Sequence, residues 1–407
     1  MNLRIPVLLM LLLGKLYRLV LNIVQQRSAN NPTPDNVADV YDAETYGQWK
    51  HYCAEKSRLG IASTALSFAA TLVLLCTNAY ATVAAWFPEG LFWQMLAVVL
   101  LETVVGTVFG VGLNYIDTMV IEQKYGFNRS AMKTFVTDQI RNLILELVLS
   151  VALCYVLLWL HTSMGDWMIL LFAGIVFGMT LIISFLYPIF SRIGNKFVPL
   201  EEGELKDRLM GLLTKHGYKV KAIEVMDASR RTTKLNAYFT GFGKMKTIVL
   251  YDNLVNAMTP DEICAVFSHE LGHGLHKDVL KRQIMNFGNL LLMAVVVWLA
   301  VREPKFHEAF GFAQVNYGFA YILAGFGLEL VQPLSGMVMN AYSRFAEYRA
   351  DRQAVQEGYG EALIQGLKKL ARENFSHLAP SKINVILEYS HPPLSQRIEA
   401  VEKELEK

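Results

Sequence analysis

The chain has 407 residues, of which 53% are hydrophobic and 18% charged, and its mean hydropathy is +0.30. This balance argues against an ordinary soluble globule and favours a mainly α-helical, polytopic membrane protein. The net charge of +2 gives no basic excess for binding phosphates, and the four scattered cysteines form no CxxC pair, so neither a nucleic-acid partner nor a thiolate metal site is expected.

Stretches long enough to cross a membrane, which takes about 20 apolar residues, recur seven times. They cover residues 5–24, 59–87, 91–116, 142–160, 167–190, 284–301 and 315–341. No cleavage pattern of small residues follows the first stretch, so we predict that it is retained as a span rather than removed as a signal peptide. The predicted organisation is five spans in 1–190, a polar segment in 191–283, two spans in 284–341 and a C-terminal polar segment in 342–407.

The distribution of Lys and Arg predicts the orientation. With seven crossings, the loops 25–58 and 117–141 share one face of the membrane with both polar segments, and both loops are rich in Lys and Arg. The connections on the other face carry only Arg302 and Lys305. By the positive-inside rule the rich face is cytoplasmic, so we expect both polar segments there.

The first polar segment predicts a small α+β domain. The leucines of "LKDRLMGLL" repeat at helical spacing, and His216-Gly217 follows as a stop. The stretches "TTKLNAYFT" and "TIVLYDNL" read as two strands joined by a turn-like "GFGK". In "TPDEICAVFSHELGHGLH", Thr259 as N-cap, Pro260 at the first helical position and Glu262 form a capping box, so the "HELGH" motif lies on a well-initiated helix.

The "HELGH" motif has the spacing of a metal site. His269 and His273 stand four residues apart on one helical face, and Glu270 is turned enough to reach a water on the same ion. A catalytic zinc needs a third protein ligand and an open fourth position. His276 lies about 10 Å along the helix axis from His269, which is too far for both to bind one ion.

The third ligand is predicted in "SRFAEYRAD", where Glu347 and Asp351 share one helical face. Glu347 can bind Zn²⁺, and Asp351 can accept the free ring N–H of a ligating histidine. Alone, this stretch could equally be a solvated helix face with internal ion pairs. Two predicted spans separate it from the histidines and return the chain to the same face, which favours the ligand reading.

Zinc there would lower the pKa of a water towards about 7, with Glu270 as the base that takes the proton. "YSHPPLSQRIEAV" offers His391 and Arg397 as donors to the oxyanion, although His391 alone could be an ordinary loop histidine. Asn236 and Ala237 of the strand "LNAYF" could bind substrate backbone by β-augmentation, or belong to a purely structural strand.

Polar residues inside the apolar runs are costly against lipid, so we expect them to face a protein interior or a wet cavity. They are Glu102, Asn114, Glu146, Asn289, Glu329 and Gln332.

Together these residues resemble the type I CAAX prenyl endopeptidases, a family of integral-membrane gluzincins. The resemblance covers most of the chain through "IEQKYGFN", "NAYF", "HELGH", "EYRAD" and "SHPPL", in the family's order. Leu235 departs from it, because better-known members usually have a polar residue before "NAYF", and this leaves substrate preference open.

The resemblance implies seven transmembrane helices around an intramembrane chamber and a cytoplasmic zinc protease domain. It implies one zinc on His269, His273 and Glu347, with Glu270 as base, His391 and Arg397 near the scissile carbonyl, and Asn236 along the substrate backbone. Members remove the last three residues of prenylated CAAX proteins. The membrane would be the endoplasmic reticulum in a eukaryote or the inner membrane in a bacterium.

Two other functions fit parts of this sequence. A general membrane quality-control metalloprotease would use the same zinc site on misfolded proteins. A non-catalytic polytopic transporter or scaffold would instead use the intramembrane carboxylates, and it is disfavoured because base, ligands and supporting carboxylate are all present.

Overall fold

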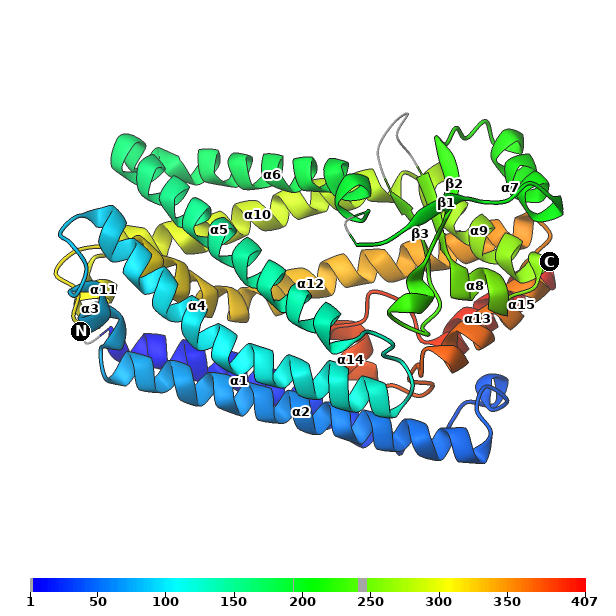
Figure 1. Ribbon diagram of the computed structural model, residues 1–407, viewed down its shortest axis with the longest axis horizontal. Helices are drawn as coiled ribbons and strands as arrows, with labels where there is room; N and C mark the ends of the chain where they lie inside the picture. The colour runs from blue at the N-terminus through cyan, green and yellow to red at the C-terminus, as the bar shows by residue number, and fades with distance from the viewer. Residues whose placement is uncertain (1–2, 193, 241–246) are drawn as a thin grey trace.

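The computed structural model describes residues 3–192, 194–240 and 247–407. Long helices lie along one axis and end in a smaller polar region that holds a sheet and short helices (Figure 1). The long helices are α1 (Arg4–Ser28), α2 (Ala43–Cys76), α4 (Leu91–Tyr115), α5 (Met132–Met164), α6 (Met168–Phe190), α10 (Asp278–Arg302) and α12 (Tyr317–Gln356).

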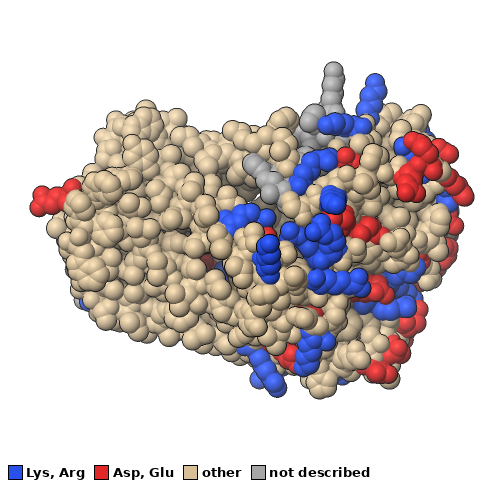
Figure 2. All heavy atoms as spheres, viewed as in Figure 1, with Lys and Arg blue, Asp and Glu red and all other residues tan. Residues whose placement is uncertain are grey.

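The long helices are those of a multi-pass membrane protein. Six segments are long and apolar enough to cross a membrane, and at most 22% of the most apolar window in each is buried. One of the six, Met132–Leu186, contains α5 and α6 with a short turn at Gly165–Trp167 between them. On the face seen in Figure 2, almost no charged side chains lie on the bundle, whereas they crowd the polar end. Such an apolar surface is the one that lipid covers.

Two predicted boundaries were wrong. The second span was placed at 59–87, but α2 already begins at Ala43, because Asp42 caps its N-terminus, and it ends at Cys76 before the short α3 (Ala79–Ala84). The seventh span was ended at 341, but α12 continues to Gln356 and passes through Pro333 without a break. One helix therefore joins the bundle directly to the polar residues around 347.

The polar end contains a four-stranded sheet of order β1-β2-β4-β3. Strand β2 (Ala222–Met226) is parallel to β4 (Thr247–Tyr251), while β1 (Phe197–Pro199) and β3 (Ala237–Thr240) are antiparallel to their neighbours. The two strands predicted from the sequence are β3 and β4. Strand β1, with three residues, and strand β2 were missed. The predicted turn "GFGK" lies outside the described residues. Among those described, β3 has no strand on its far side.

Helices pack around this sheet. They are α7 (Glu204–Lys215), α8 (Asp252–Ala257), α9 (Pro260–Leu275), α13 (Gly360–Glu373), α14 (Lys382–Leu387) and α15 (Leu394–Leu405). Helix α9 has the predicted capping box at Thr259 and Glu262, and it packs between the sheet and the C-terminal part of α12. The helix α11 (Lys305–Glu308) lies at the opposite end of the bundle.

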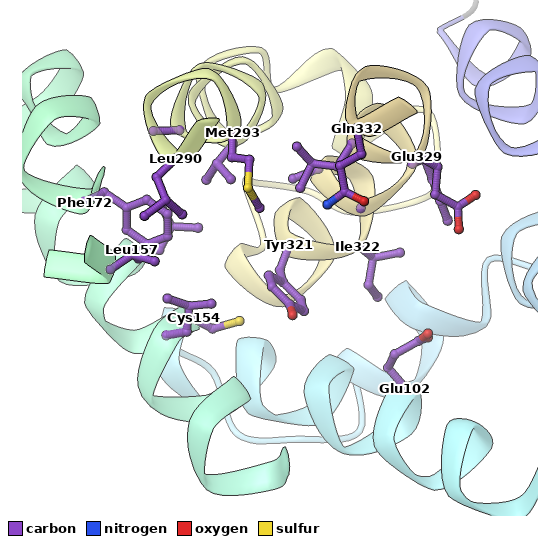
Figure 3. A pocket seen from close by; sticks show the side chains of 18 of the residues that line it. Glu102, Cys154, Leu157, Phe172, Leu290, Met293, Tyr321, Ile322, Glu329 and Gln332 are labelled. Carbon is purple, nitrogen blue, oxygen red and sulfur yellow. The ribbon is translucent and has the colours of Figure 1, made fainter. Parts of the chain in front are cut away.

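A cavity of about 470 Å³ lies inside the bundle (Figure 3). Each of the seven long helices contributes a lining residue, and Glu102, Glu329 and Gln332 are among them, as the sequence led us to expect. Their charges are partnered: Lys15 pairs with Glu329 at 2.7 Å, and the Tyr80 hydroxyl donates to Glu102 at 2.6 Å. The bundle is therefore hollow and partly polar.

Candidate active site

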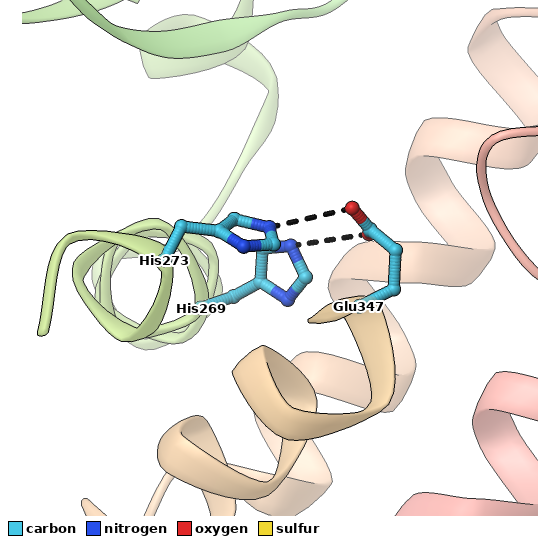
Figure 4. A group of neighbouring side chains, drawn as sticks. All are labelled: His269, His273 and Glu347. Atoms are coloured by element: carbon cyan, nitrogen blue, oxygen red, sulfur yellow. Dashed lines mark ion pairs between the residues drawn. The ribbon is translucent and has the colours of Figure 1, made fainter. Parts of the chain in front are cut away.

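Three potential ligands meet between α9 and α12 (Figure 4). His269 and His273 project from one face of α9 towards Glu347 on α12. The Nε2 atom of His269 lies 3.4 Å from Oε2 of Glu347, and Nε2 of His273 lies 3.3 Å from Oε1. One donor atom from each residue lies within 4.8 Å of the others. The tertiary structure thus brings together the three residues predicted as ligands.

The donor set fits a divalent cation such as zinc. Ligand atoms on a tetrahedral zinc, each about 2.1 Å from the ion, stand about 3.4 Å apart, which is close to the distances found here. Both Nε2 atoms face the carboxylate because both Nδ1 atoms are already hydrogen-bonded elsewhere. Oε2 of Glu347 is buried and has no hydrogen-bond partner among the described residues. Buried carboxylate oxygens are rarely left so, and a cation would satisfy this one.

Asp351 orients His269. Its Oδ1 accepts from Nδ1–H of His269 at 2.8 Å, since an ionised carboxylate can only accept. Arg397 holds the same carboxylate with two hydrogen bonds, from Nε at 2.9 Å and from Nη2 at 2.6 Å. This is the arrangement predicted for Asp351. The guanidinium of Arg397 also lies 3.6 Å from Glu347, so its nearest partners are carboxylates that support the ligands.

Asp278 orients His273, and the sequence analysis missed it. Its Oδ2 accepts from Nδ1–H of His273 at 3.0 Å, while its Oδ1 accepts from the Tyr342 hydroxyl at 2.9 Å and from Arg349. Each of the two histidines therefore has a carboxylate backed by an arginine. The available signal was an acid five residues after His273, just past the end of α9. Nothing in the sequence shows that Lys277 bends the chain there and so brings this acid beside the histidine.

The carboxylates of Asp351 and Glu347 favour the positively charged form of His269. Burial lowers the pKa of His269, but the hydrogen bonds to Asp351 and Glu347 outweigh it and raise the pKa to about 9. Burial raises the pKa of the Glu270 carboxyl, against the effect of the neighbouring histidines. A carboxylate with a raised pKa is the better proton acceptor.

A cavity of about 110 Å³ is lined by two of the three potential ligands, His269 and Glu347. Its walls include every other residue predicted for catalysis or substrate binding, namely Glu270, His391, Arg397, Asn236 and Ala237, together with the aliphatic residues Leu254, Val266, Leu363, Leu367 and Leu370. His276, which was rejected as a ligand, caps the C-terminus of α9 and does not line this cavity.

His391 stands just before α15 rather than on it. Its Nε2 lies 3.4 Å from Oε1 of Glu347, and its Nδ1 is hydrogen-bonded to the Ser390 hydroxyl at 2.9 Å. Its side chain is 63% exposed, so a ligand in the cavity can reach the ring.

The segment with Asn236 and Ala237 leads into the edge strand β3. The carbonyl of Asn236 accepts from the Tyr251 N–H on β4, and its side-chain oxygen accepts from the Ala237 N–H at 2.9 Å. Because backbone groups alternate sides along a strand, those of Ala237 point away from β4. An extended peptide could pair there, beside the ligands.

Comparisons with known proteins agree with this geometry. Residues 22–192 match the family model "CAAX prenyl protease N-terminal, five membrane helices", and residues 199–405 match "Peptidase family M48". The chain is 30% identical to CAAX prenyl protease 1 of Saccharomyces cerevisiae over 94% of this chain and 91% of that protein. It is 26% identical to the human CAAX prenyl protease 1 homolog, over 90% and 88% of the two chains.

A solved structure has the same fold. The crystal structure of S. mikatae Ste24p superposes with a TM-score of 0.89 at 26% sequence identity, and the match covers 98% of each chain. The two family models account for almost the whole chain, in the order membrane helices and then peptidase. The chain therefore belongs to peptidase family M48, as a membrane metalloprotease homologous to CAAX prenyl protease 1.

Proposed function

We propose that this chain is a zinc-dependent membrane endopeptidase that removes the C-terminal tripeptide from prenylated CAAX proteins. One observation carries most of the weight: two histidines and a buried carboxylate with an unsatisfied oxygen form a possible ligand set, and the cavity beside it is also lined by Glu270 and by the open strand edge. Metal-assisted peptide hydrolysis uses this combination, because it needs a metal, a base and a means of holding an extended backbone. The homology to CAAX prenyl protease 1 supports the substrate class.

His269, His273 and Glu347 would hold one zinc ion per chain. When bound, zinc supplies Lewis-acid polarisation of the scissile carbonyl and makes a water molecule more acidic. Glu270 would act as the base that takes a proton from the attacking water and passes it to the leaving amine, and its raised pKa suits both transfers. Asp351 and Asp278 keep the Nδ1–H tautomer of the two histidines, so that both Nε2 lone pairs stay directed at the ion.

The remaining cavity residues act on the substrate. The exposed ring of His391 can donate to the oxyanion. Arg397 holds Asp351 and adds positive charge to the same place. Asn236 and Ala237 bind the substrate backbone at the edge of β3. The aliphatic residues of α13 that line the cavity, Leu363, Leu367 and Leu370, suit the aliphatic residues of a CAAX sequence.

The membrane region receives the lipid. We infer seven crossings, with α5 and α6 as two separate spans, and the polar segments 191–283 and 342–407 as one cytoplasmic protease unit. The excess of Lys and Arg in the loops on that side supports this orientation. The hollow bundle supports a role in accommodating the prenyl chain, which would have a largely apolar cavity beside it.

The test uses purified protein in detergent with a farnesylated CAAX peptide and its unprenylated twin, and maps the cut by mass spectrometry. We expect one cut after the modified cysteine, dependent on the lipid and lost in Glu270→Gln, which should retain zinc. Glu347→Ala should lose zinc as measured by elemental analysis. Equal cleavage of both peptides at scattered bonds would replace this proposal with a general membrane protease.

A further inference from the structure

The histidine that we expect to donate to the oxyanion has few contacts of its own. The ring of His391 is 63% exposed, and among the described residues its one hydrogen bond joins Nδ1 to the hydroxyl of the preceding Ser390 at 2.9 Å. Its Nε2 atom lies 3.4 Å from Glu347, which is longer than a charge-assisted hydrogen bond of about 2.7–2.9 Å. The place of this ring therefore depends on the backbone that carries it.

An arginine on α12 holds that backbone. Nη1 of Arg344 donates to the carbonyl of Val385 at 2.8 Å and to the carbonyl of Tyr389 at 2.7 Å. Val385 belongs to α14, and Tyr389 lies two residues before His391. In the part of the chain that the structure describes, no other hydrogen bond ties the backbone of residues 388–391 to another element.

The end of α14 explains why a cation lies there. The last carbonyls of a helix have no partner within it and carry partial negative charge. Arg344 covers the carbonyl of Val385 and lies 3.5 Å from that of Ile386, while the side-chain amide of Asn340 donates to the carbonyl of Leu387 at 3.0 Å. Hydrogen bonds from a charged donor are the stronger kind, so Arg344 fixes this end of α14 firmly.

The same face of α12 carries the acidic half of the site. Asn340, Arg344, Glu347 and Asp351 follow one another at intervals of three or four residues, so they share one face of the helix. Helix α14 packs against this helix (Figure 1). Arg344 stands one turn before Glu347, the predicted ligand. One helix therefore sets both the place of the predicted ligand and the place of the segment that leads to His391.

We propose that Arg344 is a positioning residue, which keeps the ring of His391 facing the substrate by holding the chain at Tyr389. On the far side of His391 the chain is stiff, because Pro392 and Pro393 fix their own φ angles and α15 follows directly. Arg344 supplies the matching restraint on the near side. With both restraints in place, an exposed ring keeps one position without being buried.

This inference rests on the proposed function, which makes His391 the donor to the oxyanion. Arg344 does not line the cavity beside the ligands, so it acts through His391 and not on the substrate. The side-chain amide of Gln25 also reaches this segment, where it donates to the Tyr389 hydroxyl at 2.8 Å. That bond holds the tip of a side chain, and it leaves the backbone between α14 and His391 free to turn.

The test is a double-mutant cycle on kcat, with zinc content measured by elemental analysis. Arg344→Met keeps an apolar stem and removes the donors. We expect kcat to fall about 10- to 100-fold with zinc still bound, because a misplacement of about 1 Å can cost about 100-fold. In the His391→Ala background the same substitution should change kcat by less than about twofold, because no ring is left to misplace.

Arg352→Met is the matched control. Arg352 is an arginine of the same helix, but it is 55% exposed and pairs with Glu404 of α15. Surface pairs of this kind contribute little, so kcat should stay within about twofold of the wild type. Arg344→Lys keeps a cation with three donors, and it should turn over at least about threefold faster than Arg344→Met.

Four results would overturn the proposal. They are a kcat of Arg344→Met within about twofold of the wild type, an equal loss with and without the His391 ring, a loss of zinc from Arg344→Met, and wild-type turnover in His391→Ala. An equal loss in Arg352→Met would also contradict it. If Arg344→Met does not fold, Arg344→Gln, which has a shorter side chain, takes its place with the same expectations.

The two proposals can fail separately. If the wild type cuts unprenylated peptides as well as prenylated ones, the prenyl-protein function fails, while the cycle on whichever peptide is cut still decides the role of Arg344. If cleavage depends on the lipid but the two substitutions lower kcat independently, the function stands and Arg344 only stabilises α14.

Discussion

Replacing Asp278 by alanine should weaken zinc binding about 10- to 100-fold. Asp278 acts indirectly, because it contacts Nδ1 of His273 and not the Nε2 atom that would bind zinc. Asp278 is 1% exposed, and its carboxylate accepts from Nδ1–H of His273 at 3.0 Å. Without it the imidazole loses the acceptor that fixes its tautomer. An unsatisfied buried donor costs about 1–3 kcal/mol, and about 1.4 kcal/mol corresponds to a tenfold change in affinity. This cost agrees with the loss of about 10- to 100-fold expected when a supporting carboxylate is removed.

The assay is competition for zinc between the detergent-solubilised protein and a fluorescent chelator. Asp278→Asn should lose less, because its amide oxygen can still accept from His273 in the same volume. Asp261→Ala is the control: this carboxylate lies on α9, the helix that carries His273, but it is 65% exposed and paired with Arg208, so its removal should leave zinc affinity unchanged. A zinc affinity of Asp278→Ala within about twofold of the wild type would refute the reasoning.

The other predictions concern turnover, packing and pH. His391→Ala should lower kcat about 10²- to 10³-fold with zinc still bound, and wild-type turnover would return His391 to a structural role. A Cβ at Gly272 would lie 3.0 Å from the backbone of Ala350, so Gly272→Ala should lower stability by about 1–3 kcal/mol in thermal unfolding, whereas Gly211→Ala, with open space around it, should not. Burial lowers the pKa of His307 to about 4, opposed by its bond to a backbone carbonyl, so the unfolded chain binds more protons there between about pH 6.5 and 4. Stability should fall by up to about 3 kcal/mol as the pH drops through this window, and His307→Gln should flatten that part of the profile.

Local patterns predicted the helices well, because membrane spans and a capped helix depend on residues close in sequence. The capping box of α9 formed between Thr259 and Glu262 as expected. Strands β1 and β2 were not predicted, because β1 is three residues long and each is stabilised by its neighbours in the sheet rather than by its own pattern.

The sequence by itself determined that this is a membrane protein with a histidine pair, a base and an acidic partner on helices. It could also nominate Glu347 as the third ligand. Both arguments for this residue, its helical spacing to Asp351 and the two predicted spans that separate it from the histidines, need only the order of residues in the chain. Tertiary structure alone decided which groups support that chemistry. Asp278 reaches His273 because Lys277, in a left-handed conformation, bends the chain between α9 and α10, and Asn374 reaches Leu235 across 139 positions of sequence. Such contacts depend on how α9, α12 and α13 pack against the sheet, and no periodicity in one segment records the position of another.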